Sequence, residues 1–322
     1  AHPIESDWTL IQQFLLNDLC SGHKQAYEYL IQYISHALQF PWIKPGVMIA
    51  LLGGQGTGKG TFGKLIHMIW GSNYLQVHDI HAVTGNFNAS LEQAFWVFMD
   101  EALFAGDRRS TDALKSLVTE PLIYINQKHQ PARQSRSYHR FIAATNAEHF
   151  KHTERDDRRD FVLRVSEARK GDHAYWAALH AQISNGGAAA MMHDLLAMDL
   201  GHFIVRDKPQ TKALIDQKLR SLEPIPNWWY DCLLRGEIVD DSAWPDFIST
   251  SNCIEAITQI AGRSLYKNPT ASEVVRTVIN MCPSASKKQS GTKYSRQRGL
   301  ALPTLEQARA EFEDYIGGEV PW

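Results

Sequence analysis

The sequence predicts an α/β fold: a phosphate-loop core with a mainly parallel sheet, preceded by a helical segment and followed by a small, mostly helical domain. Two apolar runs, residues 47–52 and 94–99, have the length and composition of strands that are buried on both faces. A glycine-rich loop and then a helical pattern follow the first run. Strands that alternate with helices are typical of a parallel sheet covered by helices.

Length, composition and charge limit the class of protein. The 322 residues are 44% hydrophobic and 21% charged, so the chain can bury a sizeable core. The formal net charge of -2 argues against a polybasic, histone-like binder but does not exclude local basic patches. No apolar run is longer than residues 47–52, whereas a membrane span needs ~20 residues, so we expect no membrane partner. The four cysteines form no CxxC pair, which favours reduced thiols in the cytoplasm.

Changes in sequence pattern divide the chain into four predicted parts. They are an N-terminal helical segment (residues 1–45), the phosphate-loop core (46–170), a helical extension (171–210) and a C-terminal, mostly helical domain (211–322). The chain does not begin with Met, so we expect it to be a piece of a longer protein.

The glycine-rich loop is the predicted nucleotide-binding motif. Glycines let consecutive backbone N–H groups turn toward an anion, and the start of the next helix adds partial positive charge. Lys59 can then reach the β- and γ-phosphates of ATP. The predicted nucleotide-binding residues are Gly54, Gln55, Gly56, Thr57, Gly58, Lys59, Gly60 and Thr61.

The loop departs from the usual pattern at one position. Ser or Thr usually follows the lysine and binds Mg²⁺, but here Gly60 follows it and Thr61 comes next. Either Thr61 joins the magnesium shell, directly or through water, or the metal depends more on acidic residues. A Gly-Lys-Gly-Thr ending also occurs in adenylate-kinase-like enzymes, so the loop alone leaves a nucleotide kinase open.

Polar residues end two further predicted strands. Asp100 and Glu101 follow the run 94–99, where Asp100 can face Mg²⁺ and Glu101 can polarise the attacking water. An acidic pair of this kind suits hydrolysis by water better than transfer to a nucleotide, although it can also simply cap a helix. Asn146 ends the apolar run 141–144 and is either a turn residue or a contact to the γ-phosphate and the water. The acidic pair favours an ATPase over a kinase.

A run of mixed charge follows at residues 154–160. One interpretation is a solvated loop with salt bridges. The other is an arginine finger, a fixed guanidinium that stabilises transition-state charge in the ATP site of a neighbouring subunit. The arginines of this run are Arg155, Arg158 and Arg159.

Residues 122–126 and 138–144 are predicted to be the two arms of a hairpin with a basic tip. The tip holds Lys128, His129, Arg133 and Arg136 and no acidic residue. It is either a surface turn or a loop that points into a channel, where Lys128 and His129 bind the phosphates of one nucleic-acid strand.

The C-terminal domain has three predicted helices, at residues 252–261, 272–281 and 304–316. Between the last two, residues 284–300 contain five Lys or Arg residues and no acidic residue. A helix pair followed by a basic loop is compatible with a winged-helix DNA-binding module. It is equally compatible with a disordered basic connector.

In this order, the motifs resemble those of superfamily 3 helicases, specifically the C-terminal helicase part of phage and plasmid primase-helicases. The resemblance covers about residues 15–235 and includes less common stretches at 85–88, 98–102, 113–121 and 157–163. It implies an AAA+-type core that forms a hexameric ring with ATP and Mg²⁺ at each subunit interface. The function it implies is an ATP-dependent replicative helicase in the cytoplasm of a bacterial or phage-infected cell, with an upstream primase or polymerase domain on the full-length chain.

The resemblance also implies roles for individual residues. It assigns the site within one subunit to Lys59, Asp100, Glu101 and Asn146, the finger to Arg158 and Arg159, and the hairpin that grips single-stranded DNA to Lys128 and His129. Mg²⁺ would be held by Asp100 or Thr61. Two alternatives stay open: an ATP-switched protein that binds or loads DNA without opening forked DNA, and a nucleotide kinase.

Overall fold

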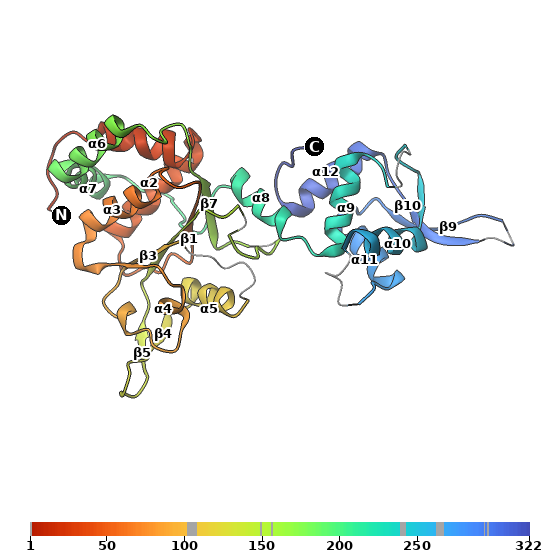
Figure 1. Cartoon of the computed structure of the whole chain (residues 1–322), viewed down its shortest axis with the longest axis horizontal. Helices are drawn as coiled ribbons and strands as arrows, with labels where there is room; N and C mark the ends of the chain where they lie inside the picture. Colours follow the sequence, from red (N-terminus) through yellow and green to blue (C-terminus); the bar gives the residue numbers. More distant parts are fainter. Residues whose placement is uncertain are drawn as a thin grey trace. The chain divides into compact units, whose positions relative to one another are not determined.

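The computed structural model describes residues 2–101, 108–148, 150–155, 157–238, 243–261, 267–292, 294 and 296–322 (Figure 1). By its internal contacts the chain divides into two compact units. Unit 1 comprises Ala1–His152 and Asp156–Gln217, and unit 2 comprises Thr153–Arg155 and Lys218–Trp322. The four-part division drawn from the sequence is a different partition and stays a prediction. None of the described helices is long and apolar enough to cross a membrane.

Unit 1 is built on a five-stranded sheet with the strand order β2-β3-β6-β1-β7, and all neighbouring strands are parallel. The strands are β1 (Met48–Leu52), β2 (Tyr74–Val77), β3 (Trp96–Asp100), β6 (Arg140–Thr145) and β7 (Asp160–Arg164). Every residue of β1 is buried, which explains why its sequence is a continuous apolar run rather than an alternating one. The predicted α/β class with a mainly parallel sheet is confirmed.

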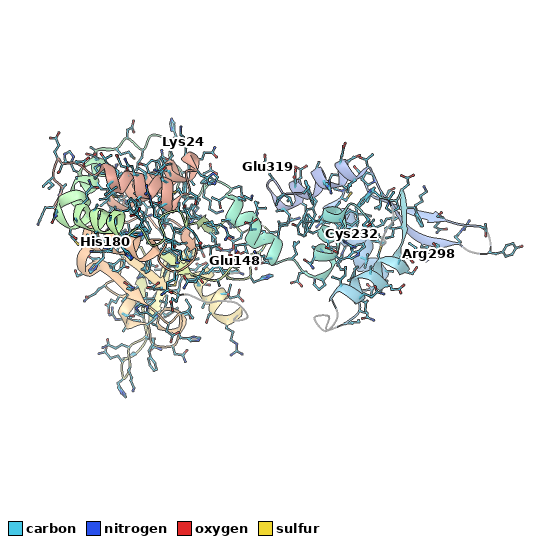
Figure 2. All side chains as sticks on the ribbon, turned by 45° about the horizontal axis from the view of Figure 1, so that its top comes forward. Lys24, Glu148, His180, Cys232, Arg298 and Glu319 are labelled. Carbon is cyan, nitrogen blue, oxygen red and sulfur yellow. The ribbon has the colours of Figure 1, made fainter. Side chains whose placement is uncertain are left out.

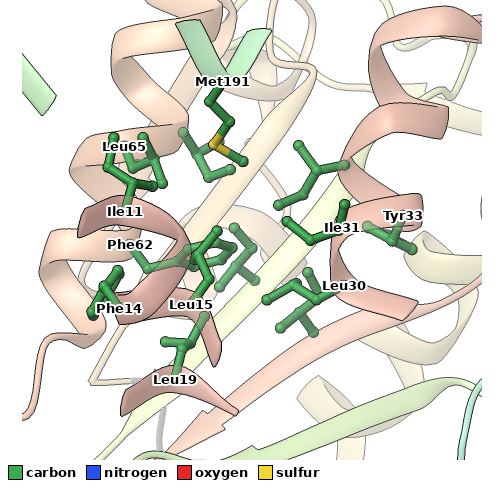
Figure 3. Close-up of a cluster of buried hydrophobic side chains, with 14 of the residues drawn as sticks. Ile11, Phe14, Leu15, Leu19, Leu30, Ile31, Tyr33, Phe62, Leu65 and Met191 are labelled. Atoms are coloured by element: carbon green, nitrogen blue, oxygen red, sulfur yellow. The ribbon is translucent and has the colours of Figure 1, made fainter. Parts of the chain in front are cut away.

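Apolar side chains cover both faces of this sheet. Residues of opposite parity on each strand enter two separate hydrophobic clusters, as in β1, where Ile49 and Leu51 belong to one cluster and Ala50 and Leu52 to the other. Figure 3 shows part of the first cluster, including Phe14, Leu30 and Phe62. Its helices are α1 (Thr9–Gln13), the π-helix η1 (Phe14–Leu19), α2 (Lys24–Gln39), α3 (Lys59–Trp70), α6 (His173–Gln182) and α7 (Ala188–Ala197).

The second face is covered by α4 (His81–Thr84), α5 (Arg108–Thr119), the strand β4 (Leu122–Ile125) and α8 (Lys212–Arg220). The strand β5 (Arg133–Arg136) is the second arm of the hairpin. Residues 212–217 of α8 belong to unit 1, where Leu214 is fully buried in this cluster.

The hairpin pairs differently from the prediction. β4 pairs antiparallel with β5, from Leu122 opposite Arg136 to Ile125 opposite Arg133. Residues 140–145 instead form β6, which lies between β3 and β1 in the main sheet. The prediction of residues 138–144 as the second arm was therefore wrong. The true arm, Arg-Gln-Ser-Arg, carries no apolar signal, whereas β6 is apolar because the sheet buries both of its faces.

Unit 2 has the element order of a winged helix. The elements are α9 (Pro224–Arg235), β8 (Phe247–Ser249), α10 (Thr250–Ala261), α11 (Ala271–Met281), β9 (Ser286–Ser290), β10 (Gln297–Ala301) and α12 (Leu305–Ile316). The strands form an antiparallel sheet in the order β8-β10-β9, so β9 and β10 make the hairpin called the wing. The three predicted helices are confirmed to within two residues, and the basic segment between them is a hairpin rather than a disordered connector.

Candidate active site

Most of the predicted nucleotide-site residues lie at one edge of the sheet. β1 leads into the phosphate loop, β3 ends at Asp100, and β6 is followed directly by Asn146. The strands are parallel, so their carboxyl ends meet at the same edge, where α/β sheets bind ligands. A cleft of about 590 Å³ there is lined by loop residues 55–61 together with Asp100, Glu101 and Asn146.

The loop backbone has the shape of an anion cradle. Gly56 and Gly58 have φ angles of 78° and 101°, in the left-handed region that favours glycine. A Cβ atom added to Gly58 would lie only 2.6 Å from the Trp176 ring, so close packing also requires glycine there. α3 starts at Lys59 with no acidic residue in its first turn, so no side chain of that turn neutralises the partial positive charge of the helix start.

Lys59 is held over the loop by three oxygen acceptors. Its Nζ donates to the carbonyl oxygens of Gly53 (2.6 Å) and Gly54 (2.8 Å) and to Oδ1 of Asn146 (2.8 Å). Burial lowers the pKa of the ammonium, while Asp100 and Glu101 act in the opposite direction. The loop and the end of β6 therefore position this cation together.

The two carboxylates differ in their surroundings. Oδ2 of Asp100 accepts a hydrogen bond from Nε2 of Gln76 (3.2 Å) and lies 3.8 Å from Nδ1 of His78. Glu101 is exposed and has a φ of 57°, which residues other than glycine seldom adopt. The chain thus turns sharply at Glu101, directly after the strand has placed Asp100 in the cleft.

Helix α6 forms a side of the cleft that sequence reasoning missed. His173, Trp176 and His180 line it, and Nε2 of His180 lies 3.0 Å from the hydroxyl of Thr61. Burial lowers the pKa of His180, and nearby Lys64 lowers it further, so the imidazole is neutral at neutral pH. These residues follow the loop by more than a hundred positions and carry no motif, so only the tertiary structure reveals them.

The predicted arginine fingers lie at the opposite edge of the sheet. The backbone N–H of Met48, the first residue of β1, donates to the carbonyl of Arg159 (2.7 Å), and β7 starts at the next residue. The five residues of β1, roughly 16 Å of extended chain, therefore separate Arg158 and Arg159 from their own phosphate loop. Neither guanidinium can serve the cleft of its own subunit.

A buried ionic cluster fixes the arginine segment. Nζ of Lys151 lies 2.7 Å from Asp160 and 3.6 Å from Asp157, and all three side chains are buried. Oδ1 of Asp157 also accepts the backbone N–H groups of Arg159 (2.8 Å) and Asp160 (3.1 Å). Arg158 is exposed at this rigid turn, while Arg159 is half-buried.

Arg155 lies in unit 2 rather than in unit 1. Its guanidinium stacks over the ring of Tyr315 at 4.5 Å, within that unit. This contact occupies the side chain and leaves Arg158 as the better-placed of the three arginines.

Only some of the basic side chains of the β4–β5 hairpin are without a partner in the described part of the chain. Lys128 and His129 are exposed in the β4–β5 turn, where His129 has a φ of 66°. Arg133 forms an ion pair with Glu92, and the exposed Arg136 forms a hydrogen bond with the Tyr138 side chain. The Asn88 side chain braces the hairpin, since it donates to the carbonyl of residue 124 (2.9 Å) and accepts the N–H of residue 126 (2.9 Å).

We compared the chain with protein families, curated proteins and solved structures. Residues 51–159, from β1 to the arginine segment, match a model described as a family of unknown function (DUF5906). No curated protein matches the chain. The chain has the fold of the NrS-1 C terminal region.

Three of the solved structures that match the chain illustrate this likeness. The apo structure of NrS-1 C terminal region (305-718) has a TM-score of 0.70 at 18% identity and covers 94% of this chain and 77% of its own. An A form apo structure gives the same values, and another gives a TM-score of 0.67 at 17% identity, with 94% and 76% covered. At 17–18% identity the likeness establishes only the fold of the chain. Its chemistry has to be inferred from the residues of the site.

Proposed function

We propose that the chain is an ATP-driven replicative DNA helicase that works as a ring and hydrolyses ATP at the interfaces between subunits. The observation that carries the proposal is the convergence of Lys59, Asp100, Glu101 and Asn146 on one cleft beside a glycine cradle. A cation, two carboxylates and an amide at a helix start are what hydrolysis of a nucleoside triphosphate needs.

Each group has a distinct role in this proposal. The loop N–H groups and Lys59 bind the phosphates. When ATP binds, a phosphate oxygen replaces one of the three oxygen atoms that now accept hydrogen bonds from Lys59. Glu101 takes a proton from the attacking water, and Asn146 orients that water. Trp176 and His173 border the same cleft and are placed to contact the nucleotide beyond its phosphates.

The donor set fits Mg²⁺. This ion is usually bound by one or two carboxylates, with phosphates and water as its other ligands. Asp100 offers such a carboxylate in the cleft, whereas the Thr61 hydroxyl contacts His180. Asp100 would therefore be the main protein ligand, and Thr61 would contribute through water or after leaving His180. The ion, when bound, would neutralise charge that develops on the phosphates.

The position of the arginines supports a ring. Arg158 is exposed on a turn fixed by buried ion pairs, at the edge of the sheet away from its own cleft. A guanidinium that completes an ATP site from there must act on a neighbouring subunit. This placement supports ATP sites at subunit interfaces and a homo-oligomeric ring.

The hairpin supports single-stranded DNA as the partner. Lys128, His129 and Arg136 are exposed on a braced two-stranded element that projects from unit 1 (Figure 1). A rigid element with cationic side chains at its tip suits contact with a phosphate backbone in a channel. Arg133 contributes less, because Glu92 neutralises it.

Strand separation on forked DNA tests the proposal. The chain, incubated with ATP and Mg²⁺, should separate a labelled fork, and Lys59→Ala and Glu101→Gln should both abolish separation. Lys128→Ala should lower DNA binding and separation while basal hydrolysis survives. Hydrolysis without separation by the native chain would favour the ATP-switched loader, and phosphate transfer to a nucleoside monophosphate would favour the kinase. The solution mass with and without nucleotide reports ring formation.

A further inference from the structure

The wing of unit 2 is a basic surface outside the site described above. Residues 284–300 contain five Lys or Arg residues and no Asp or Glu. Lys287, Lys288, Arg296 and Arg298 are all exposed on or beside β9 and β10. Within the described part of the chain, no carboxylate forms an ion pair with these four side chains. Their charge is therefore available to a partner.

The register of the hairpin places positive charge on both of its faces. Lys287 pairs with Leu300, two residues along β10 from Arg298, so Lys287 and Arg298 share one face. Lys288 pairs with Gly299 on the opposite face. Within unit 2, the hairpin extends away from the helices, and Figure 2 labels Arg298 on it. A projecting ribbon with cations on both faces suits a groove that has a phosphate backbone along each wall.

The preceding helix is not built to read bases. In helix-turn-helix folds the second helix enters the major groove and contacts base edges. The exposed face of α11 here carries one acid, Glu273, and one base, Arg276. Glu273 is also engaged in the capping box with Thr270. The wing thus carries more exposed positive charge than the helix that would determine sequence preference.

Charge is also segregated within the unit. α12 carries four acidic side chains against one arginine, Arg309, whose guanidinium donates to the carbonyl of Leu233 (2.7 Å). An anionic partner is therefore repelled by α12 and attracted by the wing, which gives the encounter a direction.

From these observations we propose that the β9–β10 wing binds the phosphate backbone of duplex DNA without reading its sequence. A single strand would call for several aromatic platforms, and among the described wing residues only Tyr294 is an exposed aromatic. A membrane surface would call for an apolar face, whereas the exposed residues of both strands are polar or charged. This is a second nucleic-acid site, separate from the hairpin of unit 1 and independent of ATP hydrolysis.

Equilibrium binding of the whole chain to duplexes of several sequences, without nucleotide, tests the wing. We compare Lys287→Gln/Lys288→Gln with Lys267→Gln/Arg276→Gln, which removes two exposed charges from the α11 side of the same unit. The wing pair should weaken duplex binding at least about tenfold and lower the slope of log K against log salt by about 2. The α11 pair should change either quantity little, and affinity should not depend on duplex sequence.

A second wing pair, Arg296→Gln/Arg298→Gln, should repeat the effect. Equal losses from the wing pairs and the α11 pair would overturn the proposal, as would wing variants that bind duplex like the native chain, because the wing would then serve another partner. A loss on single strands as large as that on duplexes would also contradict it. Lys128 and the ATP site are intact in every variant, so failure of the helicase proposal would leave these outcomes unchanged.

Discussion

At the cleft, the glycine loop and the ends of buried strands position the polar side chains. Lys59 lies among three oxygen acceptors, two of them backbone carbonyls that the glycine loop turns inward. The sequence predicts Asp100, Glu101 and Asn146 because they follow apolar runs, which burial of the strands determines, and it predicts Lys59 from the glycine-rich loop. It does not predict His180, because the contact with Thr61 depends on how a helix from a distant part of the chain packs.

Substitutions of Asn146 should separate its effect on the rate of hydrolysis from its effect on ATP affinity. Asn146→Ala removes an amide at the reacting end of the cleft and should lower the rate of hydrolysis by about 10²-fold, with a smaller change in ATP affinity. Asn146→Asp should instead weaken ATP binding, because a carboxylate 2.8 Å from Nζ would compete with phosphate for Lys59. Turnover and nucleotide titrations measure both. The same loss of affinity in both variants would show that Asn146 only shapes the turn.

At the scale of elements, strands that are buried on both faces are predictable from the sequence, and more exposed strands are not. β1, β3, β6 and β7 appear in the sequence as apolar runs. β2 and β5 do not, because partly exposed strands need no continuous apolar sequence. This is why the sequence placed the second hairpin arm wrongly. For the same reason the sequence did not decide between a winged helix and a disordered connector at residues 284–300, because the strands of the wing are polar.

Two buried histidines join elements of unit 1 in their neutral form. Nδ1 of His36 on α2 accepts from Arg140 on β6 (2.8 Å), and Nε2 of His139 donates to the carbonyl of Leu91 (2.7 Å). Burial lowers the pKa of each to about 4, and the cations Arg140 and Lys44 respectively add to the effect. Both imidazoles therefore stay uncharged in the folded protein at pH values where an unfolded histidine is protonated.

Unit 1 should consequently lose stability in mild acid. Below a pH of about 6.5 the unfolded chain binds protons that the folded chain excludes, so the free energy of unfolding falls until pH reaches about 4. Each histidine contributes up to roughly 3 kcal/mol over this range. Denaturant titrations at several pH values measure the fall, and His36→Gln should make it shallower. Equal stability at pH 7 and pH 4.5 would contradict the assignment of neutral histidines.

For the whole molecule, net charge is a poor guide to where an anionic partner could bind. The value of -2 conceals two segments without acidic residues, 127–140 and 284–300, which hold four and five Lys or Arg residues. In the first segment, residues 127–140, fewer cationic side chains are available to a partner, because Arg140 is fully buried and Arg133 is paired with Glu92. The second is an exposed hairpin in another unit. The sequence locates the positive charge, but only the fold shows which part of it is free.

The opposite placement of cleft and arginine predicts complementation between subunits. Arg158→Ala should lower hydrolysis by about 10³-fold while ATP still binds. Mixing this variant with Glu101→Gln should restore part of the activity, because an intact cleft on one subunit then meets an intact arginine on the next. Hydrolysis by the mixture is compared with that by each variant alone. No recovery in a mixture shown to form mixed rings would mean that Arg158 does not act in trans.

The central claim is that the cleft at the carboxyl edge of the sheet is an ATPase that responds to DNA. Steady-state ATP hydrolysis, with and without single-stranded DNA, tests it most directly when the native chain is compared with Glu101→Gln. We expect DNA to stimulate hydrolysis by the native chain, and we expect the rate to fall by at least about 10²-fold in the variant while ATP binding persists. Equal hydrolysis by both proteins, or none by a native chain that binds ATP and DNA, would contradict it.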